Sequence, residues 1–315
     1  MARDVDETIR RREEAAMTLR PLMARAVVMS WLVATLPEPG CAWGADAETI
    51  RARRDISYAV APDGVPQDRL TLDVFSEEGA EGRPVVVFFH GGGVDGGDKG
   101  AAGEKPARFV SEGYVFVSAN RRWVRMPGPG DGVSDSVDAL RWVTDHIAQI
   151  GGDPSRLFLI GHSAGGALAA LLATDERHLE RRGMKLGDIR AVAVLDTGGI
   201  DKLRQKREAP LAPVVRLYEQ LGLDDEQLAN TSAITFLEPD KAIPPMILHC
   251  GGARRICEAF GAKLREVGVD AEVHGTHGKT HAQINRDFGG GDDPATEEVL
   301  DFFARHGGVP RPPAT

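Results

Sequence analysis

The chain is poor in the features that mark nucleic-acid-binding proteins. Aromatic residues make up only 6% of it, and its 38 basic side chains are outnumbered by 47 acidic ones, for a formal net charge of −9. Affinity for nucleic acid comes largely from lysine and arginine clusters that neutralise phosphates. We therefore expect no nucleic-acid partner, and we interpret the basic pair Arg121-Arg122 as solvated loop charges.

The apolar run at residues 26–36 is too short to cross a bilayer as a helix, which takes roughly 20 residues. Arg20 and Arg25 precede the run, and Pro37 and small residues follow it. This arrangement is typical of a secretory signal peptide, so we expect an exported protein, periplasmic or secreted, with no integral membrane segment after cleavage. A soluble N-terminal helix is the alternative interpretation.

The sequence 45–47 provides an A-x-A cleavage pattern, and we predict cleavage after Ala47, with Gly44 as the second choice. Residues 1–47 then form the signal peptide with an unusually long charged start, which makes Met17 an alternative first residue. Residues 48–315 form the mature domain.

Cysteine is scarce, with three in the whole chain. Cys41 follows Glu38-Pro39-Gly40, which is unlike a lipid-attachment signal, and it falls within the predicted leader. Cys250 and Cys257 remain. In an oxidising compartment they could pair across a short loop, and two partly buried thiols are an equally good interpretation.

Short apolar runs alternate with helical stretches beyond residue 54. Strands are predicted at 56–60, 70–75, 84–89, 114–118, 157–160, 191–195, 246–249 and 271–274, and helices at 102–112, 132–149, 164–174, 255–267 and 294–306. The first two strands look like an antiparallel pair, and the later ones are apolar enough to be covered on both faces. The pattern predicts an α/β fold with a mostly parallel central sheet and helices on both faces. The stretch at about 200–244 is too long for an ordinary connection, so we interpret it as a small lid insertion.

The motif at 161–165, Gly-His-Ser-Ala-Gly, lies between a predicted buried strand and a helix of small residues. This G-x-S-x-G pattern places a serine on a sharp turn where its hydroxyl is exposed to a base. Ser163 is therefore the predicted nucleophile. At the N-terminus of a helix it also lies near backbone N–H groups that stabilise negative charge.

A second motif, His90-Gly91-Gly92-Gly93, follows the predicted strand at 84–89. Its glycines let main-chain N–H groups approach a ligand, and we predict an oxyanion hole formed by Gly92, Gly93 and Ala164. A phosphate-binding loop is the alternative, but no Gly-Lys-Ser/Thr follows.

Together these motifs resemble the hormone-sensitive-lipase-like and acetyl-esterase/feruloyl-esterase branch of the α/β-hydrolases over residues 54–305. The matching segments are VVVFFHGGG at 85–93, Asn120-Arg121, Asp135 before ALRW at 139–142, and GGDPSR at 151–156 leading into GHSAGG at 161–166. The resemblance implies an α/β-hydrolase fold and hydrolysis of carboxylic esters, usually with short acyl groups, without metal or organic cofactor. Many relatives have Asn-Tyr-Arg where this chain has Asn120-Arg121-Arg122, so the chain departs from them at Arg121.

The base should follow the last strand, which leaves His274, His277 and His281. His274 falls within the predicted strand. His281 lies where the loop meets a helix and matches the family's late histidine, so we predict it as the base, with His277 as the alternative.

The acid is harder to predict. Relatives normally carry it after the penultimate strand, in a pattern like His-Gly-x-x-Asp, but residues 249–258 contain no aspartate. Asp196, after the preceding strand, and Glu258 are the two substitutes, and we favour Asp196. A Ser-His dyad without an acid also stays open.

The sequence predicts a serine carboxylic-ester hydrolase acting on a small-molecule ester through an acyl-enzyme. Two alternatives remain. One is a binding protein that kept the fold after losing its acid, and the other is an amidase or peptidase that uses the same nucleophile. The oligomeric state is not predicted.

Overall fold

An eight-stranded sheet forms the centre of the structure, with strand order β1-β2-β4-β3-β5-β6-β7-β8. The strands are β1 (Ile50–Ser57), β2 (Thr71–Glu77), β3 (Arg83–Phe89), β4 (Val115–Ala119), β5 (Gly152–His162), β6 (Ile189–Leu195), β7 (Met246–Cys250) and β8 (Ala271–Gly275). β2 pairs antiparallel with β1 and β4, and the strands from β4 to β8 pair in parallel. The predicted antiparallel opening and mostly parallel sheet are confirmed.

This computed structural model describes residues 50–93, 95–127, 131–209 and 212–311. The predicted signal peptide, its cleavage site and Cys41 lie outside the described residues. Among the residues described, no helix is both long and apolar enough to cross a membrane.

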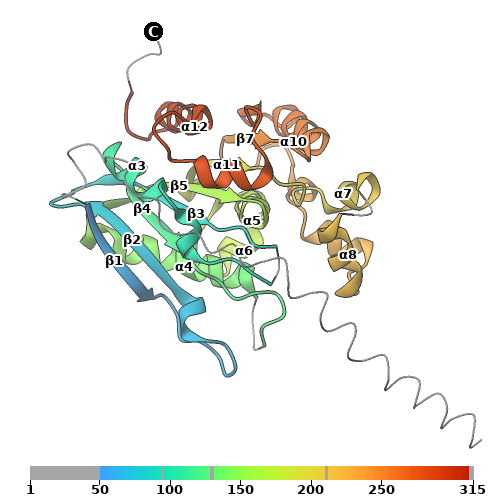
Figure 1. Cartoon of the computed structure of the whole chain (residues 1–315), viewed down its shortest axis with the longest axis horizontal. Helices are drawn as coiled ribbons and strands as arrows, with labels where there is room; N and C mark the ends of the chain where they lie inside the picture. The colour runs from blue at the N-terminus through green and yellow to red at the C-terminus, as the bar shows by residue number, and fades with distance from the viewer. Residues whose placement is uncertain (1–49, 94, 128–130, 210–211, 312–315) are drawn as a thin grey trace, which may run out of the picture. The chain divides into compact units, whose positions relative to one another are not determined.

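Helices cover both faces of the sheet (Figure 1). They include α3 (Lys105–Ser111), α4 (Gly132–His146), α5 (Ala164–Leu172), α6 (Glu176–Glu180), α10 (Arg254–Glu266), α11 (His281–Asp287) and α12 (Pro294–Arg305). Successive side chains of β3 divide between the two faces. Val85 and Val87 belong to one buried cluster with α4, α5 and α10, whereas Val86 and Phe88 belong to another with α3 and α12. Burial on both faces explains why this strand is a continuous apolar run rather than an alternating one.

The first predicted strand, at 56–60, was placed wrongly along the chain. β1 begins at Ile50 and ends at Ser57, and residues 51–55 are exposed. An edge strand with exposed, charged side chains on both faces shows no alternation of apolar and polar residues, which is the signal used to predict strands.

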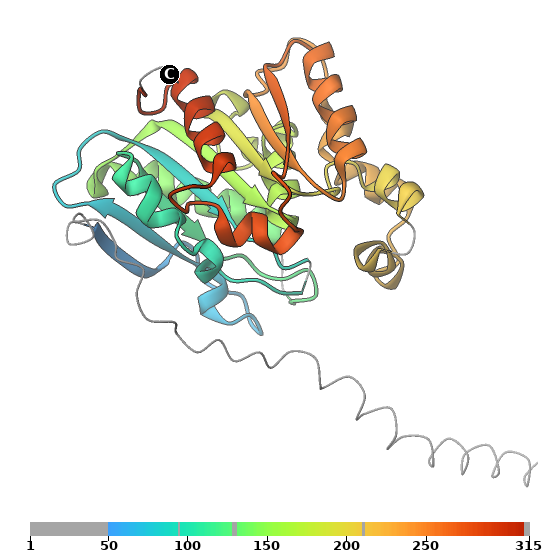
Figure 2. The same cartoon turned by 45° about the horizontal axis from the view of Figure 1, so that its top comes forward.

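The segment at 200–244 contains α7 (Lys202–Glu208), α8 (Pro213–Gln220) and α9 (Asp225–Asn230). Val215, Tyr218 and Leu228 form a small buried cluster of their own. Figures 1 and 2 show α7 and α8 grouped outside the layers that cover the sheet. The insertion therefore packs around a separate small core, as a segment added at one end of the domain would.

Candidate active site

Ser163 occupies a sharp turn between β5, which ends at His162, and α5, which begins at Ala164. Its backbone has φ 56° and ψ −121°, a conformation that side-chain-bearing residues rarely adopt. The Ser163 N–H donates to the carbonyl of Leu195 at 2.9 Å, and the Ser163 carbonyl accepts from Ala167 as α5 begins. The turn is therefore held from both sides, and the serine lies at the N-terminus of a helix.

The two glycines of the motif are required by close backbone approach. A Cβ on Gly161 would lie 2.1 Å from the Gly165 carbonyl oxygen, and a Cβ on Gly165 would lie 2.0 Å from the Phe89 carbonyl oxygen. Real Cβ contacts are not this short, so any larger residue at either position would force the backbone to move. The G-x-S-x-G spacing thus reflects packing of the elbow against β3.

His281 is the first residue of α11 and lies beside Ser163. Thr280 caps this helix by accepting from Gln283 N–H, and the Gln283 side chain accepts from Thr280 N–H in return. The His281 Nε2 atom is 3.0 Å from Ser163 Oγ. Its other ring nitrogen, Nδ1, is 2.8 Å from Asp196 Oδ2. Asp196, directly after β6, and His281, at the start of α11, are thereby joined to Ser163 in one line of hydrogen bonds.

Asp196 is buried, with 4% of its surface exposed. Besides its contact with His281, its Oδ1 accepts from Gly251 N–H at 2.7 Å, and its own N–H donates to the His249 carbonyl at 2.7 Å. Burial alone would raise the pKa of this carboxyl, but the hydrogen bonds from His281 and Gly251 outweigh burial and hold the pKa below its ordinary value. Asp196 is therefore ionised at neutral pH.

The other candidates for base and acid lie elsewhere. Glu258 is exposed on α10 and forms an ion pair with Arg254 at 2.8 Å. His277 contacts Glu298 at 3.1 Å rather than Ser163. The structure thus brings Ser163, His281 and Asp196 together and leaves these two alternatives out.

The glycine loop after β3 lies against the elbow, where a Cβ on Gly91 would come within 3.2 Å of Ser163 Cβ. Gly93 and Ala164 line the cavity that contains Ser163, whereas Gly92 is not among its lining residues. Gly92 has φ 117°, and a Cβ there would lie 2.4 Å from the Gly96 backbone. The conformation of this loop therefore depends on glycine, as the motif indicated.

Two histidines beside the motifs support the loops from below. His90 is fully buried, its Nδ1 donates to the Gly91 carbonyl at 2.7 Å, and Arg121 donates to the His90 carbonyl at 3.2 Å. His162 Nε2 donates to the backbone carbonyl of His281 at 2.9 Å. Burial is the main cause that lowers the pKa of both rings to about 4, with a further contribution from the neighbouring Arg121 for His90 and from the neighbouring imidazole of His281 for His162, so both are neutral near pH 7.

The interpretation of Arg121 and Arg122 as solvated loop charges was wrong. Both side chains are buried, and Arg122 forms a two-point ion pair with Asp135, with atoms at 2.7 and 2.8 Å. Asp135 is the residue in the sequence that could have indicated this burial. It lies within the family-like pattern and is the carboxylate with which the buried Arg122 pairs.

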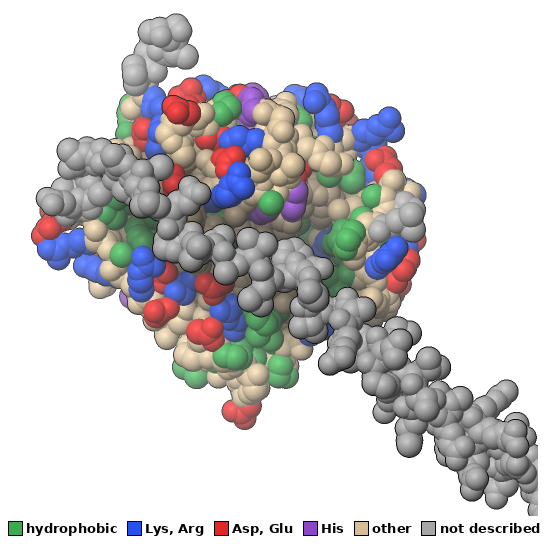
Figure 3. Space-filling view, viewed as in Figure 1, with side chains coloured by type: hydrophobic (Ala, Val, Ile, Leu, Met, Phe, Trp, Pro, Cys, Tyr) green, Lys and Arg blue, Asp and Glu red, His purple; other side chains and the backbone are tan. Residues whose placement is uncertain are grey.

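A cavity of about 1660 Å³ opens onto Ser163 and His281. Its walls come from the elbow helix, the loop at 121–124, the loop after β7 and the insertion, where Gln205, Tyr218 and Leu221 line it. In Figure 3, histidine and hydrophobic side chains lie around a hollow in the visible face. Ligand cavities are usually about 300–1,000 Å³, so this one is large enough for more than a small acyl group.

Cys250 and Cys257 form a disulfide, with Cα atoms 6.3 Å apart. The bridge links the end of β7 to the first turns of α10 and encloses the loop whose Gly251 N–H supports Asp196. Of the two interpretations left open by the sequence, the structure shows the paired one.

Comparison with known proteins places this geometry in a family. Phenmedipham hydrolase of Pseudarthrobacter oxydans is 37% identical over 115 residues, which is 34% of this chain and 23% of that protein. Esterase LipI of Mycobacterium tuberculosis is 27% identical over 213 residues, covering 64% of this chain and 66% of its own length. The chain thus spans less than two thirds of either relative. Among solved structures, inhibited esterase B from Lactobacillus rhamnosis superposes with a TM-score of 0.67 at 18% identity, covering 82% of this chain and 87% of that one.

The structural likeness shows that the fold is that of the α/β-hydrolases. A family model described as BD-FAE matches residues 72–258, which include the glycine loop, the serine elbow and Asp196. The matched segment is more than half of the chain, and we conclude that this chain belongs to the BD-FAE family.

Proposed function

We propose that the chain is a serine carboxylic-ester hydrolase that works through an acyl-enzyme. The observation that carries this proposal is the line of contacts from Ser163 Oγ to His281 Nε2 at 3.0 Å and from His281 Nδ1 to Asp196 Oδ2 at 2.8 Å. A serine hydroxyl is a weak nucleophile by itself, and a base within hydrogen-bond distance that is oriented by a carboxylate is what activates it.

In the proposed reaction, Ser163 Oγ attacks the ester carbonyl carbon while its proton passes to His281 Nε2. Asp196 keeps the His281 ring in the tautomer with hydrogen on Nδ1 and stabilises the imidazolium that forms. Backbone N–H groups of Gly92, Gly93 and Ala164 bind the oxyanion, each worth roughly 2.7–4 kcal/mol of transition-state stabilisation.

The tetrahedral intermediate then collapses. The bond to the alcohol oxygen breaks, and His281 donates its proton to the departing alcohol. Water enters, gives a proton to His281 and attacks the acyl carbon on Ser163. The bond from that carbon to Ser163 Oγ then breaks, His281 returns the proton to Oγ, and the carboxylic acid is released. Every step uses only protein groups and water.

The test is labelling with a fluorophosphonate probe followed by mass spectrometry of the tryptic peptides. We expect one adduct, on Ser163, and loss of both adduct and p-nitrophenyl acetate turnover in Ser163→Ala. An unlabelled Ser163 in folded protein would overturn the proposal and favour the binding-protein alternative. That alternative rested on a missing acid, and Asp196 lies where an acid is needed.

For substrates, we propose an ester with a short acyl group and a larger alcohol. The short acyl group follows from the family resemblance, and the volume of about 1660 Å³ leaves room for the alcohol along α7 and α8. Turnover of esters from acetate to decanoate should fall as the acyl chain lengthens. Comparison with matched anilides separates an esterase from an amidase, since a comparable rate on the anilide would favour the amidase.

We also propose that the protein is exported. The apolar run at 26–36 and the disulfide between Cys250 and Cys257 support this, because disulfides persist in oxidising compartments. Cell fractionation and N-terminal sequencing test the proposal, and we expect a mature chain that begins at Glu48. Full-length protein confined to the cytoplasm would contradict it.

A further inference from the structure

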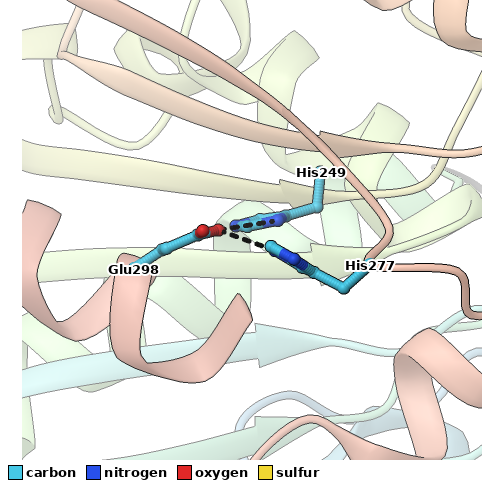
Figure 4. Close-up of side chains that lie close together, drawn as sticks. All are labelled: His249, His277 and Glu298. Atoms are coloured by element: carbon cyan, nitrogen blue, oxygen red, sulfur yellow. Dashed lines mark hydrogen bonds and ion pairs between the residues drawn. The ribbon is translucent and has the colours of Figure 1, made fainter. Parts of the chain in front are cut away.

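Three side chains with metal-binding atoms lie close together beside β7. They are His249 in β7, His277 in the turn between β8 and α11, and Glu298 in α12. One ligand atom from each lies within 4.8 Å of the other two. Figure 4 shows the carboxylate of Glu298 facing both rings.

His249 is the unusual member of this cluster. Its side chain is 0% exposed, and among the described residues neither ring nitrogen makes a hydrogen bond of good geometry, although the ring lies near the backbone of Gly275. Glu298 Oε2 lies 3.5 Å from His249 Nδ1, outside good hydrogen-bond geometry. Buried polar groups are nearly always satisfied, so a buried imidazole without a well-aligned partner, beside a carboxylate and a second imidazole, needs an explanation.

An ion pair between His277 and Glu298 accounts for only part of the arrangement, since it leaves His249 without a well-aligned partner. A bound cation would be ligated by one ring nitrogen of His249 as well as by His277 and Glu298. Zinc binds imidazole and carboxylate ligands at about 2.0–2.2 Å, and neighbouring ligands of a tetrahedral ion are then roughly 3.3–3.6 Å apart. The distances from Glu298 Oε2, 3.1 Å to His277 Nε2 and 3.5 Å to His249 Nδ1, are close to that spacing.

A third histidine, His274, lies beside this cluster. Its Nδ1 is also 3.5 Å from Glu298 Oε2, and its Nε2 lies 3.0 Å from Glu272 Oε2. Metal-bound histidines usually donate their other ring N–H to a carboxylate, which fixes the tautomer with a lone pair toward the ion. His277 and Glu298 are about one-third exposed, so an ion can reach the site from solvent.

We propose that His249, His277 and Glu298 bind a divalent cation of the Zn²⁺ type, with water as the fourth ligand. Two imidazoles and one carboxylate suit zinc better than calcium or magnesium, which prefer all-oxygen sites.

The location gives the ion a positioning role, and this part rests on the proposed esterase function. The His249 carbonyl accepts from Asp196 N–H at 2.7 Å, and His277 lies four residues before His281 on the same loop. An ion bound to both His249 and His277 therefore connects the backbone that accepts from Asp196 N–H with the turn that leads into His281.

Isothermal titration of the chelator-treated full chain with ZnCl₂ tests the site without reference to turnover. We expect one ion per chain, and binding at least about tenfold weaker in His277→Asn and in Glu298→Gln. Matched controls are His146→Asn, an exposed histidine on α4, and Glu297→Gln, the neighbour of Glu298 that pairs with Arg108 and Arg311. These should bind as the wild type does.

No zinc binding by the wild type, or unchanged binding in both cluster variants, overturns the site. X-ray absorption of the zinc-loaded wild type provides a measurement that needs no variant. Nitrogen and oxygen ligands including at least two imidazoles are expected, and a sulfur or all-water shell would refute the assignment.

The positioning role is tested by ester turnover before and after chelation. We expect chelation to lower kcat with little change in KM, and His277→Asn to be insensitive to chelation. Zinc binding with kcat unaffected by its removal overturns the positioning role, whereas absence of turnover in every sample points to failure of the proposed function instead.

Discussion

Replacement of Asp196 by asparagine tests the assignment of the acid most directly, because the new side chain keeps the shape and replaces one acceptor oxygen with an NH₂ donor. Asp196 accepts two hydrogen bonds, from Gly251 N–H at 2.7 Å and from His281 Nδ1 at 2.8 Å. An asparagine side chain has only one oxygen, so it can accept only one of the two in this geometry.

Either orientation of the asparagine harms the base. If its oxygen faces Gly251, its NH₂ group faces Nδ1 and favours the tautomer with hydrogen on Nε2, which cannot accept the Ser163 proton. If its oxygen faces His281, its NH₂ group meets the Gly251 N–H, and a buried donor is left unsatisfied at a cost of about 1–3 kcal/mol. The corresponding change in a well-studied serine protease lowers kcat about 10⁴-fold. We expect a loss of the same order here, equivalent to about 5 kcal/mol of activation free energy.

The assay is steady-state hydrolysis of p-nitrophenyl acetate at pH 7.5, with circular dichroism to show that the variant is folded. Glu258→Gln is the matched control, because Glu258 is exposed and pairs with Arg254 alone, and its rate should stay within about twofold of wild type. Near-wild-type turnover by Asp196→Asn together with a large loss in Glu258→Gln would refute the reasoning.

Three further predictions concern the framework around the site. Gly165→Ala should lower the free energy of unfolding by about 1–3 kcal/mol and reduce turnover, because the new Cβ would lie 2.0 Å from the Phe89 carbonyl oxygen. Urea unfolding measures the loss of stability. Gly291→Ala is the control, and it should be close to neutral because there is open space around Gly291. Replacing Cys250 and Cys257 by alanine should lower the free energy of unfolding by about 2–3 kcal/mol, as expected for a bridge between residues seven apart. The variant should melt at a lower temperature than the oxidised wild type, and dithiothreitol should not lower that temperature further. Equal melting temperatures of the variant and the oxidised wild type would contradict the prediction. Stability should fall on acidification from about pH 6.5 toward pH 4, since the unfolded chain protonates His90 and His162 before the folded chain, whose pKa values are about 4, does. The slope is up to about 1.4 kcal/mol per pH unit for each histidine, and a urea midpoint that stays constant between pH 7 and pH 5 would count against it.

Much of the sheet could be predicted because its central strands are buried on both faces. Each of β3, β4 and β6 is apolar at all but one residue, and their predicted positions agree with the structure to within one or two residues. β1 was misplaced because its exposed edge carries arginines rather than an alternating pattern. The separate core of the insertion was equally invisible, since it is made by Val215, Tyr218 and Leu228 meeting across three short helices.

The candidate site likewise contains some residues that could be predicted from the sequence and others that could not. Ser163 and its glycines could be predicted because local backbone sterics dictate them, and local sequence records local sterics. The partners of Ser163 come from distant parts of the chain, and only topology brings them near it. His281 followed from strand order, whereas the choice of Asp196 over Glu258 needed the direction of each side chain. The burial of Arg121 and Arg122 was missed because a pair of arginines looks solvated until the partner Asp135 is recognised.

The position of Asp196 directly after β6 has a consequence for how the proposed esterase can diversify. In relatives that carry the acid after the next strand, the loop there must preserve proton transfer as well as shape the pocket. Here that loop contributes only the Gly251 N–H to the acid, while Gly252, Ala253, Arg254 and Arg255 line the cavity. The disulfide joins residues on either side of this stretch, so its four positions can vary on a rigid frame. If the proposed esterase function holds, substrate preference and catalytic competence are encoded on different loops, and a library confined to residues 252–255 should change the first while sparing the second.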